Sequence, residues 1–205
     1  MDGSRHETLT TLVRRWTVLR PTLFVLIGAL AASAVTAIVI VVQGNFSETD
    51  GKVLGTTAAV AGVTLLALPS LVHLERRRYL PLSAAAIVAS LAAFGMLVKL
   101  IWSFDLFSDT SAVKTAGTMV IIAFAANHLS LILFAWPKGS APVAVCVGLT
   151  AGLVMAVATM LVTAIWVEAE AGPFWRALAA LAILEVLGTI TTPLLARITS
   201  PRHGS

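Results

Sequence analysis

The sequence has few charged residues and many hydrophobic ones. Charged side chains make up 12% of the 205 residues, whereas 58% of the residues are hydrophobic. Soluble globular domains carry about 25% charged residues, so a chain this poor in charge cannot cover its surface with polar groups in water. The mean hydropathy of +0.94 agrees with this conclusion. The composition predicts an integral membrane protein whose first partner is the lipid bilayer.

Cysteine and the short motifs of common chemistry are also scarce. The single cysteine, Cys146, excludes an intrachain disulfide and a cysteine-based metal cluster. The sequence contains no glycine-rich phosphate loop, no H-E-x-x-H zinc motif and no G-x-S-x-G elbow. We therefore expect that the protein is not an enzyme and has no catalytic residue, metal or cofactor. The net charge of +4 does not indicate nucleic-acid binding, because basic residues in a membrane protein mark sidedness.

Six long hydrophobic segments fill most of the chain. Each has about 20 residues or more, which is the length that a helix needs to cross the hydrocarbon core. They do not alternate between apolar and polar residues as the strands of a membrane barrel do. The sequence therefore predicts an all-α protein whose transmembrane domain covers residues 21–197, followed by a cytoplasmic tail at 198–205. The six segments are residues 21–42, 53–74, 79–98, 115–137, 141–167 and 177–196.

Basic residues concentrate in alternate loops. Ten of the 14 lysines and arginines precede the first segment or follow the second, fourth and sixth. The opposite loops contain only Lys52, Lys114 and Arg176, together with six acids. The positive-inside rule therefore places both termini in the cytoplasm, and we expect His73, beside the arginines at 76–78, to face solvent. The excess of arginine over lysine favours a bacterial protein of the inner, or plasma, membrane.

Residues 1–20 precede the first hydrophobic segment and have an amphipathic pattern. Leu9, Leu12, Trp16 and Leu19 recur at helical spacing, with arginines on other faces. This pattern fits either a cytoplasmic extension of the first membrane helix or a short amphipathic helix that lies in the interface. We favour the interface helix. The 22 uncharged residues at 21–42 exceed the apolar core of a signal peptide, about 7–15 residues, so we expect this segment to be retained.

A short phrase occurs twice in the chain. FSETDGKVLGTT at residues 46–57 is nearly repeated as FSDTSAVKTAGT at 107–118, and Lys52, Lys114 and Arg176 follow one another at intervals of 62 residues. This spacing predicts three parallel two-helix hairpins, about 21–74, 79–137 and 141–196, related by a pseudo-threefold axis along the membrane normal. The three cations would then form a ring at the outer surface. The alternative is chance self-similarity between apolar segments with similar loop lengths.

Small residues recur at every fourth position in one segment. Gly148, Gly152 and Ala156 form a face on which another helix can approach closely. The same spacing of small residues occurs at Gly28 and Ala32 and at Ala58 and Gly62. Because six helices create many seams, we expect these faces to lie inside the protein rather than at a contact between copies.

Three polar residues stand deep within the apolar segments. They are Asn127, His128 and Glu185, and Thr189 and Thr192 continue the helical face of Glu185. A carboxylate near the centre of a bilayer must pair, face a cavity or carry a proton. We therefore predict an intramembrane polar site in which His128 or Asn127 is the first candidate partner of Glu185. The alternative is a buried polar pair that only fixes the helix register.

Two classes of function fit these features. The first is a non-enzymatic structural, accessory or regulatory membrane component, whose partner is another membrane protein or a second copy. The second is a small-solute or proton-coupled transporter, in which Glu185 titrates and His128 and Asn127 line a path. A continuous polar cavity at Glu185 would favour the transporter, whereas a dry interior would favour the accessory protein. We prefer the first.

Overall fold

A computed structural model of the chain describes residues 19–43, 47–77, 79–103, 109–134, 141–170 and 172–199. Within these residues, every regular element is an α-helix. The helices are α2 (Leu19–Gln43), α3 (Glu48–Glu75), α4 (Leu80–Trp102), α5 (Thr110–Leu133), α6 (Ala141–Val167) and α7 (Pro173–Thr199). All six are long and apolar enough to cross a membrane, which confirms the prediction of an all-helical chain with six helices that could span a bilayer. The predicted interface helix at 1–20 lies outside the described residues, except for its last two positions.

Helices α3 and α5 begin five residues earlier than the hydrophobic segments that predicted them. At the start of α3, the Ser47 hydroxyl accepts a hydrogen bond from the amide of Asp50 at 3.2 Å, and Asp50 accepts one from the amide of Ser47 at 3.0 Å. At the start of α5, Asp109 accepts a hydrogen bond from the amide of Ser111 at 2.9 Å. The repeated phrase therefore contains the two N-caps, which extend each helix through a polar first turn.

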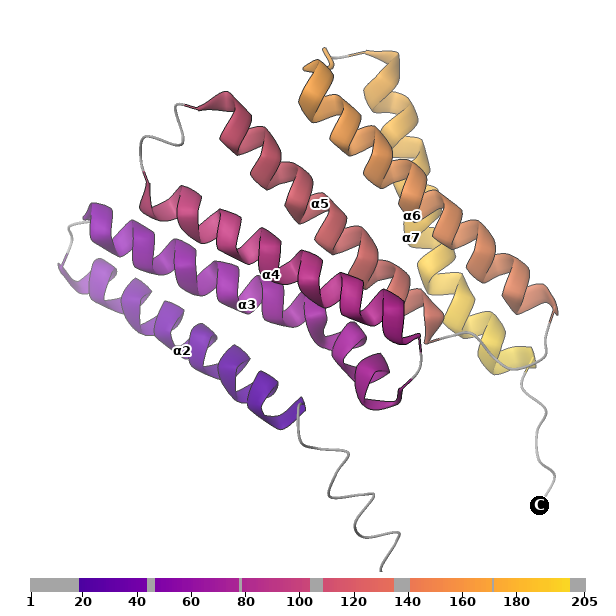
Figure 1. The fold of residues 1–205 in the computed structure, drawn as a ribbon, viewed down its shortest axis with the longest axis horizontal. Helices are drawn as coiled ribbons and strands as arrows, with labels where there is room; N and C mark the ends of the chain where they lie inside the picture. Colours follow the sequence, from indigo (N-terminus) through magenta and orange to yellow (C-terminus); the bar gives the residue numbers. More distant parts are fainter. Residues whose placement is uncertain are drawn as a thin grey trace, which may run out of the picture.

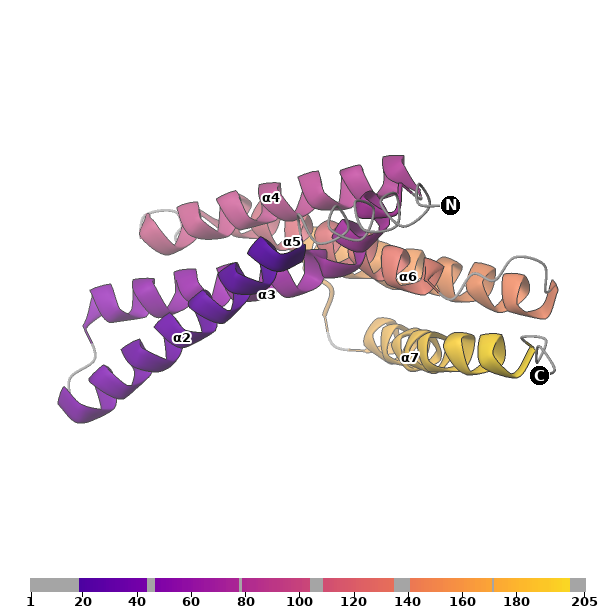
Figure 2. The same ribbon diagram turned by 90° about the horizontal axis from the view of Figure 1, so that it is seen from below.

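The six helices stand in an open row. Each helix packs against the next one along the chain, and α3 also packs against α5 (Figure 1). The C-terminal ends of α2, α4 and α6 lie along the same side of the row as the N-terminal ends of α3, α5 and α7, so the chain runs up one helix and down the next (Figure 1). Helices α2 and α7 lie at opposite ends of the row and do not pack against each other (Figure 2).

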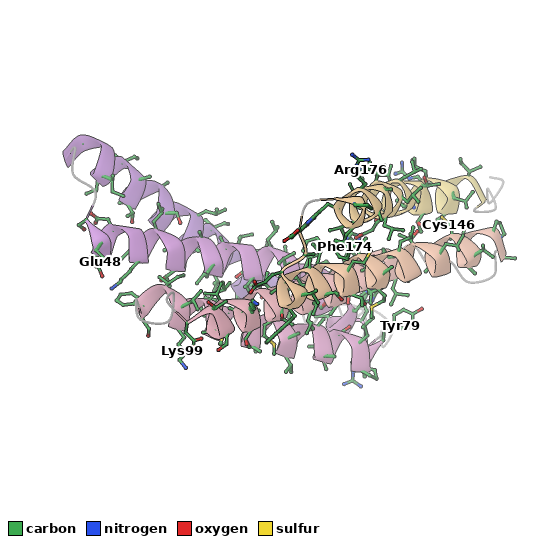
Figure 3. The ribbon with its side chains drawn as sticks, turned by 90° about the horizontal axis from the view of Figure 1, so that it is seen from above. Glu48, Tyr79, Lys99, Cys146, Phe174 and Arg176 are labelled. Atoms are coloured by element: carbon green, nitrogen blue, oxygen red, sulfur yellow. The ribbon has the colours of Figure 1, made fainter. Side chains whose placement is uncertain are left out.

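This arrangement differs from the predicted closed ring. Lys52 pairs with Glu48, and Glu48 and Arg176 lie in separate parts of the row (Figure 3). A ring of the three cations around a threefold axis would require α7 to pack against α2, and this contact is not formed. The prediction of a ring of Lys52, Lys114 and Arg176 is therefore wrong for this structure.

A tryptophan–threonine hydrogen bond recurs at two joints of the row. The indole of Trp102 on α4 donates to Thr56 on α3, and the indole of Trp166 on α6 donates to Thr118 on α5, each at 3.0 Å. Thr56 and Thr118 are the equivalent positions of the repeated phrase. On α7 the position 62 residues later is Ala180, which has no hydroxyl group, and α2 contains no tryptophan. The contact that joins the other hairpins is therefore unavailable between α7 and α2.

The small-residue faces point away from the other described helices. An added Cβ at Gly148 or Gly152 would meet nothing within 4 Å, and both glycines are exposed, with Ala156 half-buried. The predicted internal seam at these residues is therefore wrong. The close approach occurs at Gly188 of α7, where an added Cβ would collide with the Thr150 hydroxyl of α6 and lie 3.1 Å from its methyl group. Small residues permit close packing, but they do not determine which helix uses them.

Candidate intramembrane polar site

Helix α5 sends two adjacent polar side chains toward different neighbours. Successive residues of an α-helix are about 100° apart around its axis, since there are about 3.6 residues per turn. Asn127 therefore points toward α3 and α4, whereas His128 points toward α7. The sequence grouped both residues with Glu185, but the structure brings only His128 to it.

Glu185 lies at the middle of α7 and is nearly buried. It is the 13th of the 26 residues from Pro173 to Ile198, and 7% of its surface is exposed. Its Oε1 atom is 3.4 Å from Nδ1 of His128. Apart from that contact, its carboxyl group accepts no hydrogen bond from the residues that the structure describes.

Thr189 completes this group one helical turn after Glu185. Its hydroxyl donates to the backbone carbonyl of Glu185 at 2.9 Å, and Nε2 of His128 is 2.9 Å from the same hydroxyl oxygen. Both ring nitrogens of His128 are therefore in polar contact with α7. We call Glu185, His128 and Thr189 the carboxyl–imidazole group.

A cavity of about 180 Å³ lies beside this group, between α5, α6 and α7. Glu185 is its one polar lining residue, and the other walls are apolar side chains such as Val154 and Leu161. Phe124 lines the same cavity and contacts the His128 ring edge-on, with 5.7 Å between the ring centroids and 69° between the planes. The carboxyl group therefore faces an apolar space that includes an aromatic ring.

A second cavity of about 360 Å³ adjoins the first across the seam between α5 and α6. The two cavities share Ile121, Ala125 and Ala158 as lining residues. Thr159 and Thr163 also line the larger cavity, but each hydroxyl donates to a carbonyl of its own helix, at 2.8 Å and 2.9 Å. Neither space forms a continuous polar path from Glu185.

Asn127 belongs to a separate network that joins α3, α4 and α5. Its side-chain oxygen accepts from the Ser70 hydroxyl at 2.6 Å, and its amide nitrogen donates to Ser90 and to the Ala123 carbonyl, each at 2.8 Å. Ser70 also contacts Ser130 at 3.1 Å. Asn127 is 1% exposed, so its polar atoms are satisfied entirely by these helices.

Sequence reasoning missed most of this network. It placed His73 in solvent, but the structure buries it to 2% exposure, with Nε2 at 2.8 Å from the Ser130 carbonyl. The ring stacks on Phe134 at 4.2 Å between centroids, and its Nδ1 atom has no hydrogen-bond partner among the described residues. The available signal was the presence of Ser70 and Ser130 in apolar segments, because buried hydroxyls at mid-helix need partners on neighbouring helices.

Thr192 lies apart from the carboxyl–imidazole group. It donates to the Gly188 carbonyl at 2.7 Å and contacts the Cys146 sulfur at 3.3 Å. Cys146 lies where α6 faces α7 (Figure 3). Thr192 is therefore part of the packing between α6 and α7.

The predicted interface cations have different environments. Lys52 pairs with Glu48 one turn away at 2.6 Å, Lys114 pairs with Glu168 at 2.6 Å, and Arg176 is exposed. The hydrogen bond and the positive charge of Lys114 lower the pKa of Glu168. Hydrogen bonds from Ser111 likewise lower the pKa of Asp109. Lys114 thus connects the start of α5 to the residue that follows α6.

Among the described residues, no group of three or more histidines, cysteines or acids could hold a metal ion. Comparison of the chain with protein-family models, with curated proteins and with solved structures found no match.

Proposed function

We propose that this chain is a non-enzymatic accessory component of a bacterial inner membrane, which acts by lateral contact with another membrane protein or with a second copy. The observation that carries this proposal is the separation of its buried polar groups. Asn127 bonds to α3 and α4, whereas the adjacent His128 contacts α7. The polar side chains therefore connect helices instead of lining one path across the membrane, as expected of groups that stabilise a helix assembly.

The outward face of α6 offers a surface for such a contact. Gly148 and Gly152 leave open space on α6, and small residues let two membrane helices approach closely. If a second copy occupies this face, Gly148→Cys should form a disulfide-linked dimer in a Cys146→Ser background. Ile183→Cys on the exposed surface of α7 is the matched control and should stay monomeric.

Proton flux in liposomes tests the accessory function directly. With an imposed pH gradient and a pH-sensitive dye inside, the protein should add no flux to that of protein-free liposomes. Glu185→Gln should behave as the unaltered chain does. Sustained flux that the Glu185→Gln variant lacks would contradict the accessory function.

Such a flux would support the second candidate, a proton-coupled carrier. The observation that favours the carrier is the position of Glu185, which lines a cavity while contacting His128 at 3.4 Å. In this alternative, Glu185 carries the transported proton and His128 receives it.

The proposal also includes the sidedness and the hairpin repeat. Ten of the 14 basic residues lie in the loops assigned to the cytoplasm, and two recurring Trp–Thr contacts support the similarity of the hairpins. Cysteines placed at Asp109 and Glu170 in a Cys146→Ser background should react with an impermeant thiol reagent from outside intact cells. Labelling of a cysteine at Lys138 under the same conditions would reverse the topology.

A further inference from the structure

The hydrogen bonds of Thr189 define the proton positions in the carboxyl–imidazole group. A threonine hydroxyl has one proton to donate. Thr189 donates it to the backbone carbonyl of Glu185, so its oxygen must accept from Nε2–H of His128. A neutral imidazole protonated at Nε2 presents an acceptor lone pair at Nδ1. That atom is the one that lies 3.4 Å from Oε1 of Glu185.

A proton shared by these two atoms turns their contact into a hydrogen bond. It resides either on the Glu185 carboxyl or on His128, and the pair has no net charge in either case. In the other arrangement, the Thr189 hydroxyl turns to donate to Nε2, and Nδ1–H of His128 donates to a Glu185 carboxylate. The pair then has one negative charge, which is unfavourable at the middle of a membrane unless a cation balances it.

The described residues around the cavity supply no other balancing charge. The side chains of α5 and α6 that line the cavity are hydrocarbon, and the one titratable group that faces Glu185 from either helix is His128. Cys146 of α6 contacts Thr192, about two helical turns further along α7. A cation bound in the cavity would supply the charge that none of the described residues provides there.

The cavity has the properties of a site for an organic cation. Its volume of about 180 Å³ exceeds that of an apolar cavity of about 150 Å³ that holds benzene. Phe124 provides an aromatic ring in the cavity wall, and the face of such a ring attracts ammonium groups, while Glu185 provides the opposite charge. The adjoining cavity of about 360 Å³ can accept a longer apolar substituent.

We propose that this cavity binds a lipophilic ammonium ion in exchange for one proton of the Glu185–His128 pair. The cation enters with one positive charge, Nε2 of His128 releases its proton to water, and Nδ1 keeps the proton that it donates to the Glu185 carboxylate, so the net charge of the site stays zero. The Thr189 hydroxyl then turns from the Glu185 carbonyl to Nε2 of His128. The proposal concerns binding alone, so it is independent of lateral association and of proton flux through the membrane.

Benzyltrimethylammonium and its uncharged isostere neopentylbenzene test this exchange, with the full chain in lipid nanodiscs. Calorimetry in two buffers of different ionisation enthalpy measures affinity and proton release together. The ammonium ion should bind with release of about one proton per cation, as linkage requires when one charge replaces another. Neopentylbenzene should bind without proton release, because it places a carbon where the cation has nitrogen.

Three variants make the test specific to this cavity. Glu185→Gln should weaken binding of the ammonium ion by about tenfold or more and abolish proton release, while neopentylbenzene binding stays unchanged. Phe124→Leu should weaken binding of the ammonium ion by about threefold through loss of the ring. Glu168→Gln removes an exposed carboxyl that pairs with Lys114 and lies outside the cavity lining. It should change neither the binding of the ammonium ion nor the proton release.

Unchanged binding of neopentylbenzene is also the measure that the Glu185→Gln variant is folded. The proposal is overturned if the ammonium ion binds the Glu185→Gln variant as it binds the unaltered chain. Binding without proton release, or no binding of the ammonium ion when neopentylbenzene binds, overturns it as well.

Discussion

The α3–α4–α5 side and the α6–α7 side of the row both bury polar groups between apolar helices, but they satisfy them differently. On the first side, Asn127 uses its oxygen and its nitrogen in three hydrogen bonds to three helices. On the second side, the Glu185 carboxyl has one contact at 3.4 Å and faces a cavity. A saturated network therefore stabilises packing, whereas a carboxyl with unused acceptor capacity can still take a ligand.

The largest effect should come from the seam between α6 and α7. Gly188→Ala places a Cβ against Thr150, and overpacking of this kind costs about 1–3 kcal/mol of unfolding free energy. Thr150→Ala should restore most of the loss, because it removes the atoms that collide. Gly148→Ala is the matched control, since that glycine has open space. Unfolding in mixed SDS micelles measures the difference, and equal values for the two glycine variants would contradict this seam.

The second prediction compares the two polar groups directly. Asn127→Ala should lower the unfolding free energy by about 2 kcal/mol, from three hydrogen bonds at about 0.6 kcal/mol each. Glu185→Gln should change it by less than about 0.5 kcal/mol, because the one polar contact of the carboxyl among the described residues, with His128, spans 3.4 Å and glutamine keeps the shape of the side chain. Both variants are measured by unfolding in mixed micelles. A loss in Glu185→Gln as large as that in Asn127→Ala would remove the distinction between the two sides.

A smaller effect belongs to the contact that both sides share. Trp102→Phe and Trp166→Phe each remove one indole hydrogen bond to a threonine, so each should cost about 0.6 kcal/mol. Double-mutant cycles should show coupling between Trp102 and Thr56 and between Trp166 and Thr118. The crossed pair, Trp102 with Thr118, should be additive because the residues belong to different joints. Coupling in the crossed pair would mean that the joints do not act separately.

The smallest effect concerns Lys114 and Glu168, which connect the two sides at the surface. The pKa of Glu168 is lowered by the hydrogen bond and charge of Lys114, so the folded state favours the ionised form. This contribution is complete above the ordinary glutamate pKa of about 4.3 and is lost as the pH falls through the lowered value. The unfolding midpoints of Glu168→Gln and of the unaltered chain should therefore converge in acid. A difference that grows below this range would contradict the ion pair.

Hydrophobicity was sufficient to predict six helices long enough to span a membrane, because burial in lipid imposes length and apolarity on each segment. The first turns were missed, since a helix that begins at an N-cap such as Ser47 or Asp109 can start in polar sequence. The absence of packing between α7 and α2 also had a signal in the sequence. The third copy of the phrase has Ala179 and Ala180 where the first two have a glycine and a threonine.

The site was predictable in part. Helix length placed His128 within reach of Glu185, and the structure has them 3.4 Å apart. The sequence did not show that Asn127 points elsewhere, because the rotation of α5 about its axis depends on neighbours that pack against it. The roles of Gly148 and Gly152 were predicted wrongly for the same reason. A small residue permits a close contact between helices, but it does not identify the contacting helix.

The position of Asn127 next to His128 has a mechanical consequence. Asn127 clamps α5 against α3 and α4, so turning α5 about its axis would break the hydrogen bonds to Ser70 and Ser90. Helix α5 is therefore a fixed wall. Helix α7 lies at the end of the row, packed against α6, and its polar link to α5 runs through His128. Because α5 is held in place, any widening of the space beside Glu185 must come from displacement of α6 or α7, the two other helices that line it.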